Sequence, residues 1–152
     1  VGWGSVEEEM HYREISEKLG VGSQCIWHGK IPNAMVHQLM RESDIFFFTS
    51  ILEGTPHVVL EAISNNLPVL CFDLCGQGVI INDKIGWKIR VDSLENAERE
   101  MSKILNLIDK DRTLLLKKSV NCEERKPELS WENKIKQVVQ IYEDVIAHYS
   151  LH

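Results

Sequence analysis

Apolar residues follow two patterns along this chain, and together the patterns predict strands alternating with helices. Short apolar runs of strand type occupy four segments, residues 24–28, 44–49, 68–72 and 86–91. Apolar residues spaced as on one face of a helix occupy the segments around them, residues 5–19, 33–40, 58–65 and 93–108. This alternation predicts an α/β fold with a Rossmann-like, mostly parallel sheet flanked by helices.

Local signals place the ends of several helices. Ser5 followed by Glu8 forms a capping box, and Gly20 ends the helix that this box opens. Asn33 is the expected N-cap of the next helix. Pro56 stands where the first residue of a third helix is expected, since its missing N–H would be unpaired there in any case.

Two further segments carry structural signals. The run from Asp44 to Thr49 is continuously apolar after its first residue and rich in aromatics, so we expect the centre of the sheet there, covered on both faces. Near the C-terminus, Pro127 breaks the helical pattern and Ser130 caps a final helix at about residues 130–149. That helix carries an apolar stripe.

Composition and charge narrow the classes of protein. The chain has 152 residues, of which 43% are hydrophobic, enough for one domain over residues 1–152 with its own core. The formal net charge is -6, and the basic residues are dispersed, which argues against nucleic acid as a partner. No run of eighteen apolar residues and no signal-peptide pattern occurs, so we expect a cytoplasmic protein.

The cysteines and histidines give no indication of a metal site. The histidines lack the spacing of metal ligands. No C-x-x-C pair occurs among the four cysteines, which are Cys25, Cys71, Cys75 and Cys122. We therefore expect reduced thiols in the core and no bound metal.

The segment from Ser50 to Ala62 carries the candidate chemistry, because it runs from a buried strand through a loop into the start of a helix. Open α/β sheets bind ligands at this kind of position. Free backbone N–H groups from Thr55 to Val58 would face a phosphate, and the helix dipole would favour its negative charge. Gly54 would let the ligand approach the backbone closely.

Two carboxylates flank this helix start. Glu53 lies in the loop, whereas Glu61 lies about a turn and a half inside the helix among apolar residues. A carboxylate can accept hydrogen bonds from two adjacent hydroxyls, so Glu61 suits a ribose and Glu53 a second polyol. Phosphate between two polyols describes a nucleotide sugar. The alternative is structural, with Glu61 paired to His57 one turn earlier and Glu53 merely solvated. His28 similarly could face a base or be only half exposed.

The same residues resemble a known family, the retaining GT-B glycosyltransferases of the family-4 type, or glycosyl transferases group 1. The resemblance rests on the Glu53-x7-Glu61 spacing within E-G-T-P-H-V-V-L-E-A and on the N-L-P-V-L that follows. It extends through W-H-G-K-I-P-N near residue 30, S-D-I-F-F-F-T-S before the motif, Gly76 and Gly86 after it, and S-W at Ser130. It therefore covers nearly the whole chain.

The resemblance implies a nucleotide-sugar-binding domain that holds a UDP-, GDP- or ADP-sugar without a metal ion or other cofactor. In such a domain Glu61 would bind the ribose diol and Glu53 would contact hydroxyls of the donor sugar. The backbone of Gly54, Thr55, Pro56, His57 and Val58 would hold the sugar and the diphosphate. The loop at Gly29 would meet the base through main-chain groups, and Gly76 would line the opposite side.

The sequence also departs from the family pattern. The Arg and Lys that neutralise the leaving diphosphate in the family precede Val1-Gly2-Trp3-Gly4, which looks like the end of the second strand. The acceptor-binding N-terminal domain is also absent, so we expect no turnover by this chain alone. In the usual strand order 3-2-1-4-5-6, the first and second strands are the ones missing here. They would lie between the strand that starts at Gln24 and the strand that starts at Asp44. We expect these two strands to pair directly, or the chain to self-associate through the exposed edge.

For the parent protein, the resemblance implies a retaining transfer of a hexose to a glycan or lipid-linked acceptor in polysaccharide assembly. The acceptor would bind to the N-terminal domain, and the parent could work at the inner face of the membrane. Two alternatives stay open, a nucleotide-sugar epimerase of the same architecture and a non-catalytic nucleotide-binding α/β module.

Overall fold

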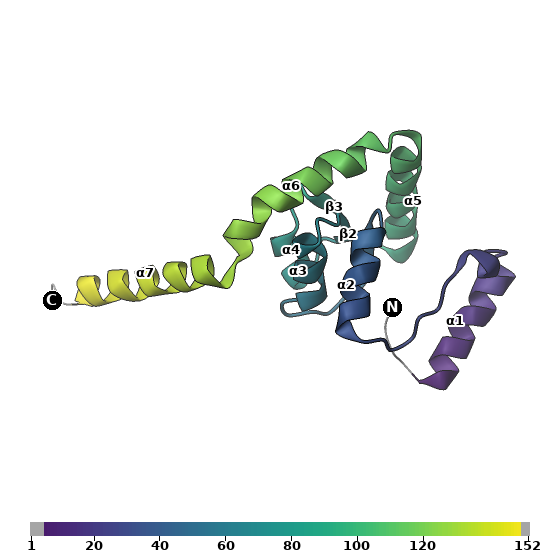
Figure 1. Ribbon diagram of the computed structural model, residues 1–152, viewed down its shortest axis with the longest axis horizontal. Helices are drawn as coiled ribbons and strands as arrows, with labels where there is room; N and C mark the ends of the chain where they lie inside the picture. The colour runs from purple at the N-terminus through teal and green to yellow at the C-terminus, as the bar shows by residue number, and fades with distance from the viewer. Residues whose placement is uncertain (1–4, 150–152) are drawn as a thin grey trace. The chain divides into compact units, whose positions relative to one another are not determined.

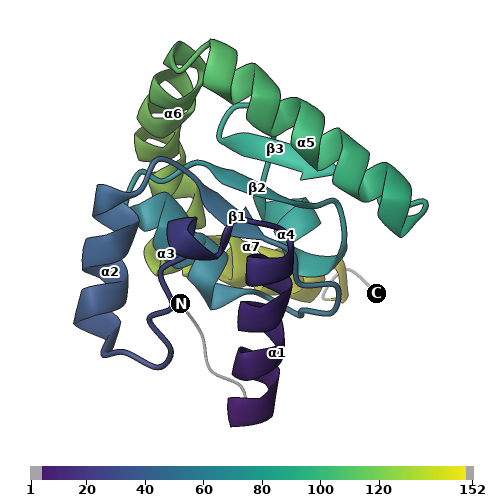
Figure 2. The same cartoon turned by 90° about the vertical axis from the view of Figure 1, so that its right-hand side faces the viewer.

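The computed structural model describes residues 5–149, which fall into two compact units, Val1–Leu39 and Met40–His152. Figure 1 labels the α-helices and the strands β2 and β3, and Figure 2 labels β1 as well. In order they are α1 (Val6–Lys18), η1 (Gly22–Gln24), α2 (Asn33–Glu42), β1 (Phe46–Phe48), α3 (His57–Ser64), β2 (Val69–Phe72), α4 (Cys75–Ile80), β3 (Gly86–Ile89), α5 (Leu94–Lys110), α6 (Thr113–Leu129) and α7 (Trp131–Tyr149). The segment Val1 to Gly4, which we interpreted as the end of a strand, lies outside the described residues.

The first unit begins with the predicted capping box. Ser5 Oγ accepts a hydrogen bond from the backbone N–H of Glu8 at 3.1 Å, and the Glu8 carboxylate accepts one from the Ser5 N–H at 2.7 Å. The helix ends at Gly20, whose φ of +72° lies in the left-handed region that favours glycine. Farther along, the Arg13 guanidinium lies 5.2 Å from the centre of the Trp27 ring. This cation–π contact joins α1 to the segment that follows it.

The strand predicted at Gln24 to His28 is absent. Gln24 closes a 3₁₀ turn, with the Cys25 N–H donating to the carbonyl of Gly22 at 3.1 Å. Residues 25–28 then run without regular structure, and the Ile26 side chain is 79% exposed. An apolar run becomes a strand only where a neighbour completes its ladder of hydrogen bonds. No such neighbour pairs with it among residues 5–149, so the expected pairing with the Asp44 strand is wrong as well.

The sheet lies in the second unit and consists of three parallel strands in the order β1-β2-β3. Phe46 of β1 is in register with Val69 of β2, which is in register with Gly86 of β3. All four residues of β2 are buried. The α/β class and the parallel sheet flanked by helices are therefore as the sequence predicts.

The Asp44 to Thr49 strand does not form the centre of this sheet. In the described residues β1 pairs only with β2, so it is an edge strand, and Phe47 is 47% exposed. The expectation that this strand is covered on both faces is wrong. Its aromatic content reflects packing on one face, where the rings of Phe46 and Phe48 stack at 5.6 Å.

Helices cover both faces of the sheet, because successive residues of a strand point to opposite sides. On one face Leu70 and Phe72 pack with Ala97 and Met101 of α5 in a buried cluster. On the other face α3 packs on β2 and α6 packs on α3. Figure 2 shows α5 running along β3, with α3 and α6 on the other side of the strands.

The ends of three helices differ slightly from the prediction. Asn33 is the first residue of α2 and not its cap, because the Val36 N–H bonds to the carbonyl of Pro32. Pro56 is the N-cap of α3 and not its first helical residue, since its ψ of 99° is extended. Pro127 lies inside α6, which continues to Leu129.

The final helix begins where the sequence predicts. The Asn133 N–H donates to Ser130 Oγ at 3.3 Å, and α7 follows from Trp131. The apolar stripe of α7 is exposed along its length, and none of the residues of α7 is buried. Its packing contacts within this unit are with α6.

The prediction that all four cysteines are core thiols is wrong for two of them. Cys71 on β2 and Cys122 on α6 are fully buried, and burial raises the pKa of each thiol to about 11. Cys25, in the segment after the 3₁₀ turn, and Cys75, the first residue of α4, are exposed. All four are free of disulfide bonds.

Candidate functional site

The start of α3 has open hydrogen-bond donors at the carboxyl-terminal edge of the parallel sheet. The chain leaves β1 at Phe48, passes through a loop and enters α3 at His57. The Val59 N–H donates to the carbonyl of Pro56 at 3.0 Å, whereas the N–H groups of His57 and Val58 donate to no acceptor within residues 5–149. With the helix dipole, these free donors suit an anion such as a phosphate.

The loop in front of α3 exposes its backbone. Gly54 and Thr55 are exposed, and their N–H groups have no acceptor within residues 5–149. A Cβ added at Gly54 would meet no atom within 4 Å. Pro56 is buried and anchors the end of the loop at the helix start. The structure thus brings the predicted backbone residues 54–58 together on one continuous surface.

Glu53 is fixed at the base of this loop. Ser50 Oγ donates a hydrogen bond to the Glu53 carboxylate at 3.0 Å, and the side chain of Glu53 is partly buried. The backbone carbonyl of Glu53 accepts from the Gly76 N–H at 3.5 Å. Glu53 is therefore held from both its carboxylate and its backbone, and it is not a freely solvated loop residue.

Gly76 lies directly against the loop that carries Glu53. A Cβ added at Gly76 would come within 1.9 Å of the carbonyl oxygen of Gly54 and within 2.8 Å of the Pro56 ring. Only glycine permits this approach of two backbone segments. Gly76, the second residue of α4, therefore lets the start of this helix lie against the loop that leads into α3.

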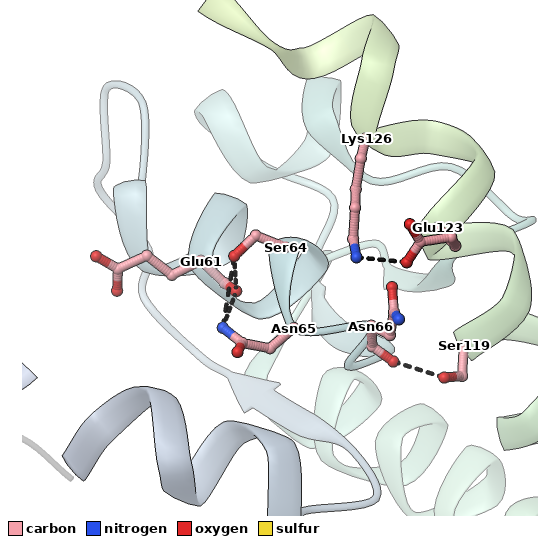
Figure 3. A network of polar contacts seen from close by, with 7 residues as sticks. All are labelled: Glu61, Ser64, Asn65, Asn66, Ser119, Glu123 and Lys126. Carbon is pink, nitrogen blue, oxygen red and sulfur yellow. Dashed lines mark hydrogen bonds and ion pairs between the residues drawn. The ribbon is translucent and has the colours of Figure 1, made fainter. Parts of the chain in front are cut away.

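Glu61 presents a carboxylate that no basic group neutralises. Its backbone carbonyl accepts hydrogen bonds from Ser64 Oγ at 2.7 Å and from Asn65 Nδ2 at 2.8 Å. Its carboxylate forms no ion pair within residues 5–149, and the alternative pairing with His57 does not occur. Figure 3 shows the carboxylate extending away from Lys126, which bonds to Glu123 at 2.5 Å. The Glu61 carboxylate is therefore free to accept hydrogen bonds from a ligand.

A groove of about 440 Å³ lies along the outer side of α3 and includes Glu61 in its lining. Its walls come from α3 and from the junction of α6 with α7. The lining residues are His57, Leu60, Glu61, Ile63, Ser64, Lys126, Leu129, Ser130 and Trp131. Glu61 and His57 therefore border a space large enough for part of a nucleotide-sized ligand.

Gly29 belongs to the first unit. Its φ of +57° lies in the left-handed region, and a Cβ there would meet no atom within 4 Å. The neighbouring His28 is half-buried. The backbone turns at Gly29 in a way that other residues adopt only with strain, as suits a loop that binds through main-chain groups.

Two residues of the loop scaffold were given no role by sequence reasoning. Ser50 lies in the motif segment, and its position three residues before Glu53 was the signal available. Gln77 is fully buried, and its Nε2 donates to the carbonyl of Ser50 at 2.9 Å. No local pattern marks Gln77, because its partner lies 27 residues earlier in the chain.

Between residues 5 and 149, no three His, Cys, Asp or Glu side chains gather as ligands for a metal ion. None of the helices in that range combines the length and the apolar character needed to cross a bilayer.

Comparison with known proteins identifies the family. The family model described as "Glycosyl transferases group 1" matches residues 1–124. The chain belongs to this family. As a member of the glycosyl transferases group 1, it has an α/β fold that matches the GT-B glycosyltransferases among solved structures.

Three relatives illustrate the likeness. The UDP-Gal:alpha-D-GlcNAc-diphosphoundecaprenol alpha-1,3-galactosyltransferase of Escherichia coli is 31% identical over 91 residues, covering 56% of this chain and 22% of that protein. The putative teichuronic acid biosynthesis glycosyltransferase TuaC of Bacillus subtilis (strain 168) is 40% identical over 48 residues, covering 32% of this chain and 12% of that protein. The structure of HepE from Anabaena in complex with UDP has a TM-score of 0.74 at 17% identity, covering 94% of this chain and 39% of that one.

The matched part of this chain thus spans less than a quarter of the length of these two curated relatives. Both relatives carry the name of a glycosyltransferase. The family membership therefore applies to the domain described here.

Proposed function

We propose that this chain is the nucleotide-sugar-binding domain of a retaining glycosyltransferase of the family-4 type. Glu61 binds the ribose diol of the donor, and Glu53 contacts hydroxyls of the donor sugar. The backbone from Gly54 to Val58 holds the diphosphate, Gly29 meets the base, and Gly76 borders the donor sugar. The donor is a UDP-, GDP- or ADP-sugar, bound without a metal ion.

The observation that carries this proposal is that two carboxylates, those of Glu53 and Glu61, flank open backbone donors at one helix start. The N–H groups of His57 and Val58 have no acceptor within residues 5–149. Glu61, one turn into the same helix, has no cationic partner there, and Glu53 is fixed at the other end of the loop. A diphosphate fits the donors, and polyols fit the carboxylates. A purely structural pair of glutamates would be neutralised or fully solvated.

For the parent protein we propose transfer of a hexose, with retention of the anomeric configuration, to a glycan or lipid-linked acceptor in polysaccharide assembly. The names of the relatives support this class, since they refer to teichuronic acid biosynthesis and to a diphosphoundecaprenol acceptor. No Lys or Arg occurs in residues 50–57 or 73–79, the two loops of the site. We therefore expect the 152 residues by themselves to bind donor without transferring the sugar, because the leaving diphosphate lacks a cationic partner there.

The test is a calorimetric titration of the chain with UDP, GDP and ADP. We expect saturable binding of one of the three nucleotides, and loss of that binding in Glu61→Ala. Glu98→Ala is the matched control, since Glu98 is exposed on α5, away from the groove. Circular dichroism establishes that all three proteins fold. Binding that survives in Glu61→Ala would contradict the role of Glu61, and absence of binding to the folded chain would contradict the donor site.

A further inference from the structure

We infer that Gln77 and Ser50 are positioning residues that together hold the Glu53 carboxylate in place for the donor sugar. Gln77 Nε2 donates to the carbonyl oxygen of Ser50 at 2.9 Å. The hydroxyl of the same Ser50 donates to the Glu53 carboxylate at 3.0 Å. Gln77 therefore fixes the backbone of Ser50, and the side chain of Ser50 fixes Glu53. This inference rests on the proposed function, because it assigns the arrangement to sugar binding.

In its buried environment, Gln77 would cost free energy if it served only to fill space. The side chain is fully buried, and its Oε1 has no hydrogen-bond partner within residues 5–149. Leaving a buried acceptor unpaired costs free energy that a side chain of the same size without polar atoms, such as Met, would not cost. The one hydrogen bond that the side chain makes to a described residue is directed at the loop of the candidate site. The amide therefore acts through that bond and not through its packing alone.

The short helix that carries Gln77 is itself fixed from the sheet. Lys88 of β3 forms an ion pair with Asp73 at 3.0 Å and donates to the carbonyl oxygen of Gly78 at 2.8 Å. These contacts hold α4 at both its entrance and its middle. A continuous set of polar contacts thus leads from β3 through α4 and Ser50 to Glu53.

Three backbone carbonyls of the loop are held by α4 and the residues around its start. The Gly76 N–H donates to the carbonyl of Glu53, Cys75 Sγ lies 3.6 Å from the carbonyl of Ile51, and Gln77 takes the carbonyl of Ser50. Of these, the bond from Gln77 is the shortest, and Gln77 is the one fully buried residue among the three donors. Removing it should release the loop more than removing either of the others.

The first experiment tests the arrangement without any ligand, by hydrogen exchange of the backbone amides. Gln77→Met keeps the volume of the side chain and removes the donor. We expect faster exchange of the Gly76 amide, whose N–H donates to the Glu53 carbonyl of the loop at 3.5 Å, with little change in β2. Asn121→Leu is the matched control, because Asn121 Nδ2 also donates to a backbone carbonyl, that of Lys84, at 2.9 Å. Unchanged exchange of the Gly76 amide in Gln77→Met would overturn the inference.

The second experiment separates sugar binding from nucleotide binding. The affinity of the chain for UDP-galactose divided by its affinity for UDP measures the contribution of the sugar to binding. We expect Glu53→Gln, Ser50→Ala and Gln77→Met each to lower this ratio by roughly tenfold, about the worth of one hydrogen bond to a charged group. Their affinity for UDP alone should stay close to that of the unchanged protein. If the titration shows that the chain binds GDP or ADP and not UDP, the pair becomes GDP-mannose with GDP or ADP-glucose with ADP.

A double-mutant cycle distinguishes positioning from general stability. If Ser50 and Gln77 act through Glu53, Ser50→Ala and Gln77→Met should have no further effect on the ratio in a Glu53→Gln background. Additive effects in that background would overturn the inference. Gln77→Glu supplies the rescue, because a protonated carboxyl can donate to the Ser50 carbonyl and an ionised one cannot. The affinity ratio of Gln77→Glu should therefore recover as the pH falls. A ratio that does not recover would contradict the role of the hydrogen-bond donor at position 77.

The two proposals can fail separately. Absence of nucleotide binding to the folded chain would contradict the proposed function, while faster exchange of the Gly76 amide in Gln77→Met would still support the bond from Gln77 to Ser50. Nucleotide binding that requires Glu61, together with an unchanged ratio in Ser50→Ala and Gln77→Met, would overturn the present inference and leave the proposed function standing.

Discussion

The central strand β2 and the final helix α7 are both rich in apolar residues, but they differ completely in burial. Every residue of β2 is buried, and Val69, Leu70 and Cys71 are fully inaccessible. None of the nineteen residues of α7 is buried, although its stripe contains Ile135, Val138 and Tyr142. Apolar periodicity therefore identifies a helix without telling which surface covers it. The stability of the second unit should reside in the sheet and in the helices that pack on it.

The largest effect should follow a cavity in the sheet. Leu70→Ala removes a fully buried side chain that packs with Ala97 and Met101 of α5. We expect a loss of about 2–5 kcal/mol in the free energy of unfolding, measured by denaturant titration followed by circular dichroism. A loss below 1 kcal/mol would show that β2 is not the centre of the core.

The contact between β2 and β3 should be nearly as sensitive. A Cβ added at Gly86 would lie 2.3 Å from the carbonyl oxygen of Val69, so Gly86→Ala must push the two strands apart. We expect a loss of roughly 1–3 kcal/mol in the free energy of unfolding. Gly54→Ala is the control, since an added Cβ there meets no atom within 4 Å. Equal losses in the two variants would contradict the close approach at Gly86.

The buried thiols should make the core sensitive to high pH. Burial raises the pKa of Cys71 and of Cys122 from 9.0 to about 11. Between these values the unfolded chain releases the thiol proton and the folded chain keeps it, so the free energy of unfolding should fall as the pH rises from about 9 toward 11. Below pH 9 both states keep the proton, and these thiols should add no pH dependence.

The measurement compares denaturant titrations at pH 8 and at pH 10.5. Cys122→Ala should lose less stability over this interval than the unchanged protein, because one of the two groups is gone. Cys75→Ser serves as the control, since Cys75 is exposed. An identical pH dependence in all three proteins would contradict the effect of burial on these thiols.

The smallest effect should come from α7. Val138 is 49% exposed and contributes no buried surface to the core. We expect Val138→Ala to change the free energy of unfolding by less than about 0.5 kcal/mol. Leu115→Ala on α6, where the side chain is 7% exposed, provides the contrast and should cost several times more. A large loss in Val138→Ala would show that the stripe is covered in solution.

The sequence predicted the elements that carry a local signal and missed those that depend on distant partners. The capping box at Ser5, the cap at Ser130 and the buried strand at Val69 each follow from a few adjacent residues. The run of three phenylalanines indicates a strand, but its place at the edge depends on which strands pair with it. Residues 24–28 failed as a strand for the same reason.

The candidate site shows the same division. Gly54, Glu53 and Glu61 could be singled out because the motif is contiguous and ends in a helix start. The helix α4 was missed, since it has only six residues, includes two glycines and starts at Cys75 with a φ of +47°. Gln77 could not be found without it, because its role depends on a fold that brings residue 77 beside residue 50.

The way in which α4 holds the preceding loop has a consequence for how this domain can diversify. The contacts with α4 reach the carbonyl groups of Ser50, Ile51 and Glu53, whereas the side chains of Ile51 and Leu52 are 59% and 87% exposed. Every amino acid offers the same backbone carbonyl, whatever its side chain. Mutation at positions 51 and 52 can therefore alter the surface beside the proposed donor site without disturbing the hydrogen bonds that hold the loop. Residues 51 and 52 are therefore two positions at which substitutions can produce new specificities with little effect on the structure.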